Sequence, residues 1–291
     1  MKRAALALLC APYFFTPTHL KAAPHSSRVP MLLELFTSEG CPDGPEADRL
    51  IEKLDREQPF PGVDLIVLSE HVDYFNGLGW ADPFSLPMFI DRQRDYAQLI
   101  AGNLIVPRTV LAATHTVSVD RTANETQVYT PEIIVDGTVG FAGSDEGDAQ
   151  QAVRKALRNQ KTSIGIKVEP LDKKVKISIH MDQRPDGTLY LALAHDAVQS
   201  RVLGGPNAGL VLSHVAVVYS MQQIGNLNEN GTGYDREITV KVQPASRIVA
   251  FVEKAPAAGV EDAVSLSARV LHKSVGHAGI GRVTAIGQAR L

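Results

Sequence analysis

One cysteine carries most of the chemistry that this sequence could perform. Cys41 follows the apolar run at residues 31–36 and precedes Pro45, which the first turn of a helix tolerates. A sulfur in such a turn lies at a helix N-terminus, where unpaired amide groups and the helix dipole favour a thiolate. The pattern therefore predicts a buried strand, a turn that holds the cysteine, and a helix.

The spacing around Cys41 excludes self-contained dithiol exchange. That reaction requires Cys-x-x-Cys, so that the second sulfur can resolve a mixed disulfide, and Gly44 occupies the second position. Carboxylates at Glu39, Asp43 and Asp48 also oppose ionisation of the thiol. Cys41 is therefore either the thiol of a one-cysteine reaction or a small buried residue of the core, and the sequence leaves both interpretations open.

A second group of polar and aromatic residues follows the next apolar strand, expected over residues 63–69. The strand-helix-strand order predicts a parallel crossover, which places the carboxyl ends of both strands at the edge where ligands of open α/β sheets bind. His71 could act as a base or as a partner of the thiol, and Asp73 could orient it. Alternatively, both satisfy loop backbone while the aromatic side chains close the core. The residues expected to converge with Cys41 are His71, Asp73, Tyr74, Trp80 and Asp82.

The N-terminus predicts export from the cytoplasm. Lys2 and Arg3 precede an apolar run at residues 4–15 and small residues near position 23, so residues 1–23 are expected to be a signal peptide of a secreted or periplasmic protein. The run is too short to span a bilayer, and no transmembrane segment is expected in the mature chain. Loss of residues 1–23 would leave Cys41 as an odd thiol in an oxidising compartment, a candidate for reaction or intermolecular pairing.

Composition narrows the range of partners. The chain has 291 residues, 44% hydrophobic content and a net charge of −3, which favours neither nucleic acid nor an acidic membrane as a partner. No cofactor or metal is expected, because the histidines of the second half lack metal-ligand spacing: His195, His214, His272 and His277. The expected partner is a protein or a small-molecule thiol, and the oligomeric state is left open.

The remaining segments predict how the chain is organised. A helix is expected at residues 88–100, and residues 103–127 are expected to form an added hairpin or flap. Asp136-Gly137 indicates a hairpin, and Ser144 or Asp145 can cap a closing helix. Residues 163–275 alternate apolar and polar side chains in seven strand candidates, which predicts a β-sandwich, and residues 276–291 are expected to be a loose tail.

Five ordered blocks of sequence carry a family resemblance. They are ELFTSEGC, HVDYFNGLGWADPF, the run at residues 91–97, VYTPEIIVDG and FAGSD, and they cover roughly residues 32–157. This combination resembles the bacterial secreted, thioredoxin-like family of unknown function numbered 1223. The segment at residues 205–218 extends the similarity weakly into the second half.

The resemblance implies a thioredoxin-like α/β domain at residues 29–158. Members of the family usually carry Cys-x-x-Cys followed by Pro-Pro-Ala-Asp, so Cys41 corresponds to the first cysteine, and Pro45, Ala47 and Asp48 fit the rest. Gly44 in place of the second cysteine departs from that pattern. Thr130 and Pro131 lie where thioredoxin-like proteins keep a cis proline that faces the reactive cysteine. The resemblance implies a fold and a secreted location, and no substrate.

Three functional hypotheses remain. The first is a monothiol thioredoxin-like oxidoreductase of the envelope, with Cys41 as the thiol, Pro131 shaping its pocket and His71 as the base. The second is a non-catalytic binding or scaffold protein that has lost dithiol activity. The third is a one-cysteine peroxidase, which requires a cationic neighbour for its thiolate such as His71 or Arg108.

Overall fold

The computed structural model describes residues 28–100, 104–105, 128–255 and 280–291. The expected signal peptide at residues 1–23 and almost all of the expected insertion at residues 103–127 lie outside these described residues. Within them, no helix combines the length and apolar character needed to cross a bilayer.

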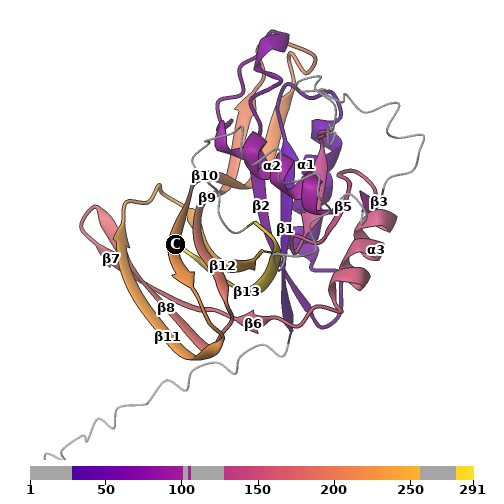
Figure 1. Ribbon diagram of the computed structural model, residues 1–291. Helices are drawn as coiled ribbons and strands as arrows, with labels where there is room; N and C mark the ends of the chain where they lie inside the picture. The colour runs from indigo at the N-terminus through magenta and orange to yellow at the C-terminus, as the bar shows by residue number, and fades with distance from the viewer. Residues whose placement is uncertain (1–27, 101–103, 106–127, 256–279) are drawn as a thin grey trace, which may run out of the picture.

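The N-terminal half begins with the predicted strand-helix-strand unit. It comprises β1 (Val29–Thr37), α1 (Gly44–Glu57) and β2 (Val63–His71). Both strands are almost entirely buried, as their continuous apolar runs require. They pair in parallel along their whole length, with Thr37 opposite His71 at the carboxyl edge. The predicted crossover is therefore confirmed, and it places the turn that follows β1 beside the segment that follows β2 (Figure 1).

The next elements complete the N-terminal half of the fold. They are the 3-10 turn η1 (Asn76–Leu78), α2 (Met88–Ile100), β3 (Leu104–Ile105), β4 (Glu132–Val135), β5 (Val139–Ala142) and α3 (Glu146–Ala156). The predicted hairpin at Asp136-Gly137 is confirmed, and both residues adopt the positive φ that this turn needs. Asp145 caps α3 by accepting from the amide of Asp148 at 2.9 Å.

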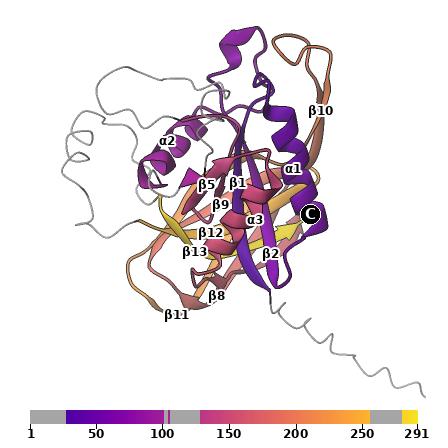
Figure 2. The same ribbon diagram turned by 90° about the vertical axis from the view of Figure 1, so that its right-hand side faces the viewer.

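The helices cover opposite faces of the sheet. Apolar residues of α1 and α3, such as Leu50 and Val153, pack with Leu33 of β1 in one core cluster. Phe89 and Tyr96 of α2 pack on the other face with Leu32 and with residues of the C-terminal half. Figure 2 shows α1 and α3 on one side of the strands and α2 on the other. Alternate residues of one strand thus enter two different cores, as the period of two demands.

A single ten-stranded sheet runs through both halves of the chain. Its order is β3-β5-β4-β1-β2-β10-β9-β12-β13-β6, and the two halves meet where Val217 of β10 lies opposite Ser69 of β2. The strands not yet defined are β6 (Thr162–Ser163), β9 (Gly187–Arg201), β10 (Val211–Leu227), β12 (Ser246–Lys254) and β13 (Arg282–Arg290). The sheet is thus continuous across the boundary expected between two domains.

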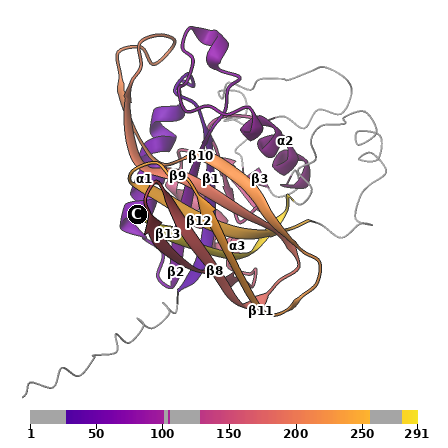
Figure 3. The same cartoon turned by 90° about the vertical axis from the view of Figure 1, so that its left-hand side faces the viewer.

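A smaller antiparallel sheet packs on the C-terminal part of the large one (Figure 3). It consists of β7 (Gly165–Leu171), β8 (Lys174–Arg184) and β11 (Gly231–Val240). Ile177 and Ile179 of β8 share a buried cluster with Leu191 of β9 and Ile248 of β12, so apolar side chains of the two sheets meet face to face. The chain is therefore a mixed α/β protein with a large sheet and a three-stranded antiparallel sheet.

The prediction that residues 276–291 form a loose tail is partly wrong. Within residues 276–291, β13 pairs with β12 from Arg282 to Arg290 and lies between β12 and β6 in the large sheet. Val283, Ala285 and Ile286 on this strand are fully buried. Such a short apolar set gains its stability from pairing with distant residues, which the local pattern does not reveal. The strand expected near residues 264–271 lies outside the described residues.

Candidate functional site: a buried cysteine edge

The thiol of Cys41 is buried and protonated. The turn that follows β1 is closed by hydrogen bonds from the Cys41 amide to the Ser38 carbonyl (3.0 Å) and from the Gly44 amide to the Cys41 carbonyl (3.1 Å). The Cys41 side chain has no exposed surface, and its Sγ donates to the carbonyl of Thr130 at 3.4 Å. Burial raises the pKa of this thiol to about 12, although backbone amides at the start of α1 lower it.

The chain segment that contains Thr130 contacts three side chains, those of Cys41, Tyr74 and Gln93. The Thr130-Pro131 peptide bond is cis. The Tyr74 hydroxyl contacts Thr130 Oγ1 and donates to Gln93 of α2 at 3.3 Å. Gln93 in turn donates to the Tyr129 carbonyl (2.7 Å) and to Glu132 (2.9 Å). The pKa of Glu132 is raised to about 8 by burial. Cys41, Tyr74, Thr130 and Pro131 thus lie together, as expected.

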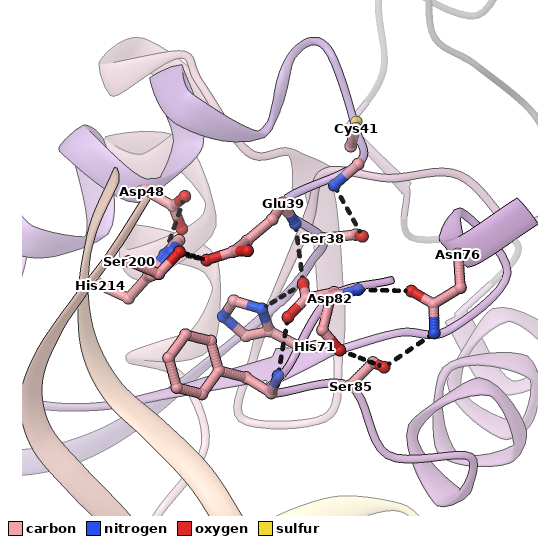
Figure 4. A network of polar contacts seen from close by, with 12 residues as sticks. Ser38, Glu39, Cys41, Asp48, His71, Asn76, Asp82, Ser85, Ser200 and His214 are labelled. Carbon is pink, nitrogen blue, oxygen red and sulfur yellow. Dashed lines mark hydrogen bonds and ion pairs between the residues drawn. The ribbon is translucent and has the colours of Figure 1, made fainter. Parts of the chain in front are cut away.

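Glu39 is the centre of a second polar network, two residues before the cysteine (Figure 4). Its carboxylate accepts from Trp80 Nε1 at 2.7 Å, from the Ser200 hydroxyl and from His214 at 3.3 Å. Its amide donates to Asp82 at 2.8 Å. Although burial opposes it, the hydrogen bonds from these side chains lower the pKa of Glu39. Glu39 is therefore an ionised carboxylate inside the protein.

His71 does not serve the thiol in this structure. Its Nδ1 lies 2.7 Å from an oxygen of Asp82, and its Nε2 has no hydrogen-bond partner among the described residues. In Figure 4 the sulfur of Cys41 points away from His71. Asp82 occupies the orienting position expected for Asp73, whose carbonyl accepts from the Asn76 amide at 3.0 Å. The site thus joins His71 to Asp82 and Glu39 rather than to Cys41.

His214 joins the C-terminal half to this network. Its Nε2 contacts Glu39, and its Nδ1 forms an ion pair with Asp48 at 3.1 Å that lacks hydrogen-bond alignment. Burial disfavours the charged ring, but Asp48 and Glu39 together raise the pKa of His214 to about 10. The His214 ring also meets the His71 ring edge-on at a centroid distance of 4.8 Å. An imidazolium therefore neutralises part of the buried negative charge.

The loop between β9 and β10 packs against the turn that holds Cys41. Asn207, which is buried, donates to the carbonyls of Glu39 (2.9 Å) and Cys41 (2.7 Å). A Cβ on Gly204 would lie 2.3 Å from the Gly79 carbonyl, so glycine is required for this close approach. The cysteine turn is therefore clamped by residues more than 160 positions away.

Sequence reasoning missed most of the second network. The sequence predicts that Glu39 and Asp48 oppose ionisation of the thiol, and Asp48 also matches the family pattern, but it does not predict that both contact His214. Ser200, Asn207 and His214 lie in the C-terminal half, and no local pattern signals their approach. Among the described residues, no group of three or more His, Cys, Asp or Glu side chains is arranged to hold a metal ion.

The fold and the site define a class: a mixed α/β protein with a buried, protonated cysteine at the carboxyl edge of two parallel strands, where it contacts distant polar residues. The chain belongs to the family described as "Protein of unknown function (DUF1223)", which matches residues 32–123 and 117–253. No curated protein matches it. It is similar in fold to the X-ray structure of a protein from Agrobacterium tumefaciens, with a TM-score of 0.58 and 20% identity over 90% of this chain and 94% of that chain.

Proposed function

We propose that this chain is a thioredoxin-like, non-catalytic binding protein of the cell envelope. The observation that carries the proposal is the state of Cys41, which is fully buried, protonated and hydrogen-bonded as a donor. A thiol is nucleophilic only as a thiolate, and a raised pKa leaves almost none at neutral pH. Gly44 also removes the resolving sulfur. The turn that holds Cys41 therefore resembles a thioredoxin-like thiol site in its position, but its thiol is unreactive.

The order of elements supports the thioredoxin-like part of the proposal. A parallel β1-α1-β2 unit is followed by an antiparallel β4-β5 hairpin and α3, and β4 pairs with β1. Thr130 adjoins Cys41, and Pro131 follows it at the start of the hairpin. The envelope location rests on the sequence of residues 1–23 and is part of the proposal.

An apolar surface beside the cysteine edge is the proposed contact surface. Four exposed apolar side chains lie on the η1 segment, in the β9-β10 connection and at the start of β10, and we call them the apolar rim: Leu78 (52% exposed), Leu203 (74%), Leu210 (46%) and Val211 (60%). The Gly79 and Gly204 backbones touch, so the η1 segment and the β9-β10 hairpin tip lie side by side, at the top of Figure 1. Exposed apolar clusters commonly mark interaction sites.

Charge indicates the kind of partner. Residues 74–81 and 202–212 contain no charged side chain, and exposed Arg201, which pairs with Val211, lies at the margin of the rim, so the rim itself is apolar. We propose that the rim binds an uncharged, apolar segment of another envelope protein. The anchored Asn207 beneath the rim would hold this surface rigid, which reduces the entropy lost on binding.

Site-specific photo-crosslinking in the envelope tests the proposal. A photoreactive residue at Leu203 is expected to give one adduct of defined mass that excess purified protein competes away and that Leu210→Glu abolishes. The control position is Leu171, which is 49% exposed on β7 in the small sheet. Equal adducts at both positions, or an adduct that Leu210→Glu leaves intact, would contradict the proposal.

Monothiol exchange is the second candidate, because backbone amides of Asp43 and Gly44 at the start of α1 still lower the thiol pKa. It requires the turn to open and expose Cys41. If purified wild-type protein exchanged thiols with a small disulfide and Cys41→Ser did not, monothiol chemistry would replace the binding proposal. The peroxidase hypothesis has less support, because His71 pairs with Asp82 and Arg108 lies outside the described residues.

A further inference from the structure

A buried charged cluster, separate from the networks around Cys41, joins α2 to both halves of the large sheet. Arg92 of α2 donates to Glu34 of β1 at 2.8 Å and to Glu253 of β12 at 2.6 Å, and it lies 3.6 Å from Glu70 of β2. The Tyr96 hydroxyl donates to Glu34 at 2.7 Å and also contacts Glu253. We call these five residues the Arg92 cluster.

The charges of the Arg92 cluster do not balance when all its carboxyls are ionised. Three glutamates face one guanidinium, and the side chains of Arg92 and the three glutamates are at most 1% exposed. Both carboxylate oxygens of Glu70 lack a hydrogen-bond partner among the described residues. An unpaired buried carboxylate is costly, and such a group takes up a proton instead. The geometry of the described residues therefore favours proton binding by the cluster.

Among the residues that the structure describes, the other groups that face Arg92 do not supply the missing positive charge. Its guanidinium lies over the rings of Tyr96, Tyr190 and Phe251, at 4.9, 5.7 and 5.4 Å from their centroids. Asp95 adds further negative charge near Tyr190. The neighbouring cation Lys161 is paired with Asp136, which itself lies close enough to Glu34 to feel its charge.

We propose that the Arg92 cluster is a pH-sensitive latch, which holds α2 on the sheet while Glu70 and Glu253 are protonated and loosens α2 when they ionise. Burial raises the pKa of Glu253 to about 7 and that of Glu70 well above its usual range, and Glu34 adds to both shifts. Because the folded pKa values exceed the unfolded ones, the latch is strongest in acid and weakens as the pH rises through 7.

Helix α2 connects the Arg92 cluster to the turn that holds Cys41. Gln93, next to Arg92, holds the Tyr129 carbonyl and Glu132, and the adjacent Thr130 carbonyl accepts from Cys41. Glu132 is also protonated near neutrality, because burial raises its pKa to about 8. Loosening of α2 above neutral pH would therefore release the backbone that caps the thiol. This inference stands whether or not the apolar rim binds a partner.

Amide hydrogen exchange tests the latch in the full chain. Where reclosing is faster than intrinsic exchange, protection factors remove the intrinsic pH dependence and report the opening equilibrium alone. Between pH 6 and pH 8.5, the protection of α2 in the wild type is expected to fall at least tenfold, while that of α1 changes less than threefold. Equal changes in α1 and α2, or no change in either, would overturn the proposal.

Two variants separate the latch from general alkaline weakening. Glu253→Gln mimics the protonated carboxyl and is expected to keep α2 protected at pH 8.5. Glu237→Gln makes the same change at a side chain that is 65% exposed and should behave as the wild type. If Glu253→Gln loses α2 protection as the wild type does, the proposal fails. If that variant does not fold, the ¹³C carboxyl titration of wild-type Glu253 decides: a midpoint near 7 supports the latch, and one near 4.5 refutes it.

Discussion

At the scale of single residues, burial outweighs the helix terminus at Cys41. The amides of Asp43 and Gly44 favour the thiolate, but the loss of water favours the thiol more strongly, and the charges of Asp43 and Asp48 act in the same direction as burial. The thiol then donates to the Thr130 carbonyl, as a neutral group should. Cys41 is therefore part of the packing of the edge in the folded state.

Alkylation of Cys41 should be strongly suppressed by folding. Because the pKa rises from 9.0 to about 12, the thiolate fraction at pH 7.5 falls about a thousandfold, and burial slows reagent access further. We expect mass spectrometry to find iodoacetamide labelling at least that much slower than in a urea-unfolded control. Labelling within tenfold of the control would show that the thiol is exposed, and would favour monothiol chemistry.

A second cysteine at position 44 should restore a disulfide at some cost in stability. A Cβ on Gly44 would lie 3.6 Å from the Cβ of Cys41, a separation that suits a disulfide, but 2.8 Å from the Ser38 carbonyl. We expect Gly44→Cys to lose about 1–3 kcal/mol when reduced, because the turn must shift.

Oxidation should then remove two hydrogens from the variant, which mass spectrometry detects as a loss of about 2 Da. The double variant Cys41→Ser, Gly44→Cys carries the same steric change without a partner thiol and should show no such loss. Failure of the single variant to oxidise while folded would mean that the turn cannot align the two sulfurs.

At the scale of elements, α1 is fixed to the C-terminal strands by a buried arginine. Both terminal nitrogens of Arg247 in β12 donate hydrogen bonds to Asp55 of α1 at 2.8 Å. The Arg247 guanidinium also donates two hydrogen bonds to Asp196 of β9, at 2.7 and 2.9 Å. Arg290 of β13 contacts both aspartates from the exposed side. The Arg247 side chain is only 1% exposed, so these contacts are poorly screened by solvent.

Removal of Arg247 should destabilise the whole chain. Arg247→Ala leaves two carboxylates without their main partner, and we expect a loss of about 3–5 kcal/mol in the free energy of unfolding measured with urea. Arg94→Ala is the control: its pair with Asp91 is exposed, and it should cost less than about 1 kcal/mol. A cost for Arg247→Ala as small as that of the control would show that the junction between α1 and the strands is unimportant.

At the scale of the whole molecule, buried ionisable groups set how stability depends on pH. Glu39 and Asp82 have lowered pKa values despite burial, so their contribution is present above their unfolded pKa and is lost in acid. His214 has a raised pKa of about 10, so its contribution is complete below about 6.5 and is lost as the pH rises through 10. The Arg92 cluster weakens in the same alkaline direction.

Stability should therefore decline between pH 7 and pH 10, and His214 should cause part of that decline. We expect His214→Gln to reduce the slope of unfolding free energy against pH in this window, measured by urea titration, because the side chain no longer binds a proton. His195→Gln removes a histidine whose pKa is lowered by burial, so it carries no proton between pH 7 and pH 10 and should leave the slope close to that of the wild type. An unchanged slope in His214→Gln would exclude an imidazolium at this position.

The sequence by itself determined the local elements and the cysteine turn. Continuous apolar runs gave β1 and β2, the first-turn Pro45 and an apolar stripe gave α1, and Asp136-Gly137 gave the hairpin, because each depends on residues close together in the chain. The absence of a second cysteine at Gly44 likewise needed no structure. The convergence of Trp80 and Asp82 near Cys41 followed from the parallel crossover.

Only the tertiary structure decided the state of the site. His214, Ser200 and Asn207 reach the edge because β10 pairs with β2, and β13 joins the sheet through long-range pairing that local propensity does not encode. The protonation of Cys41, Glu253 and His214 depends on burial and on charges from other elements. Electrostatic interactions and desolvation act through space, so residue types and spacing along the chain cannot fix them.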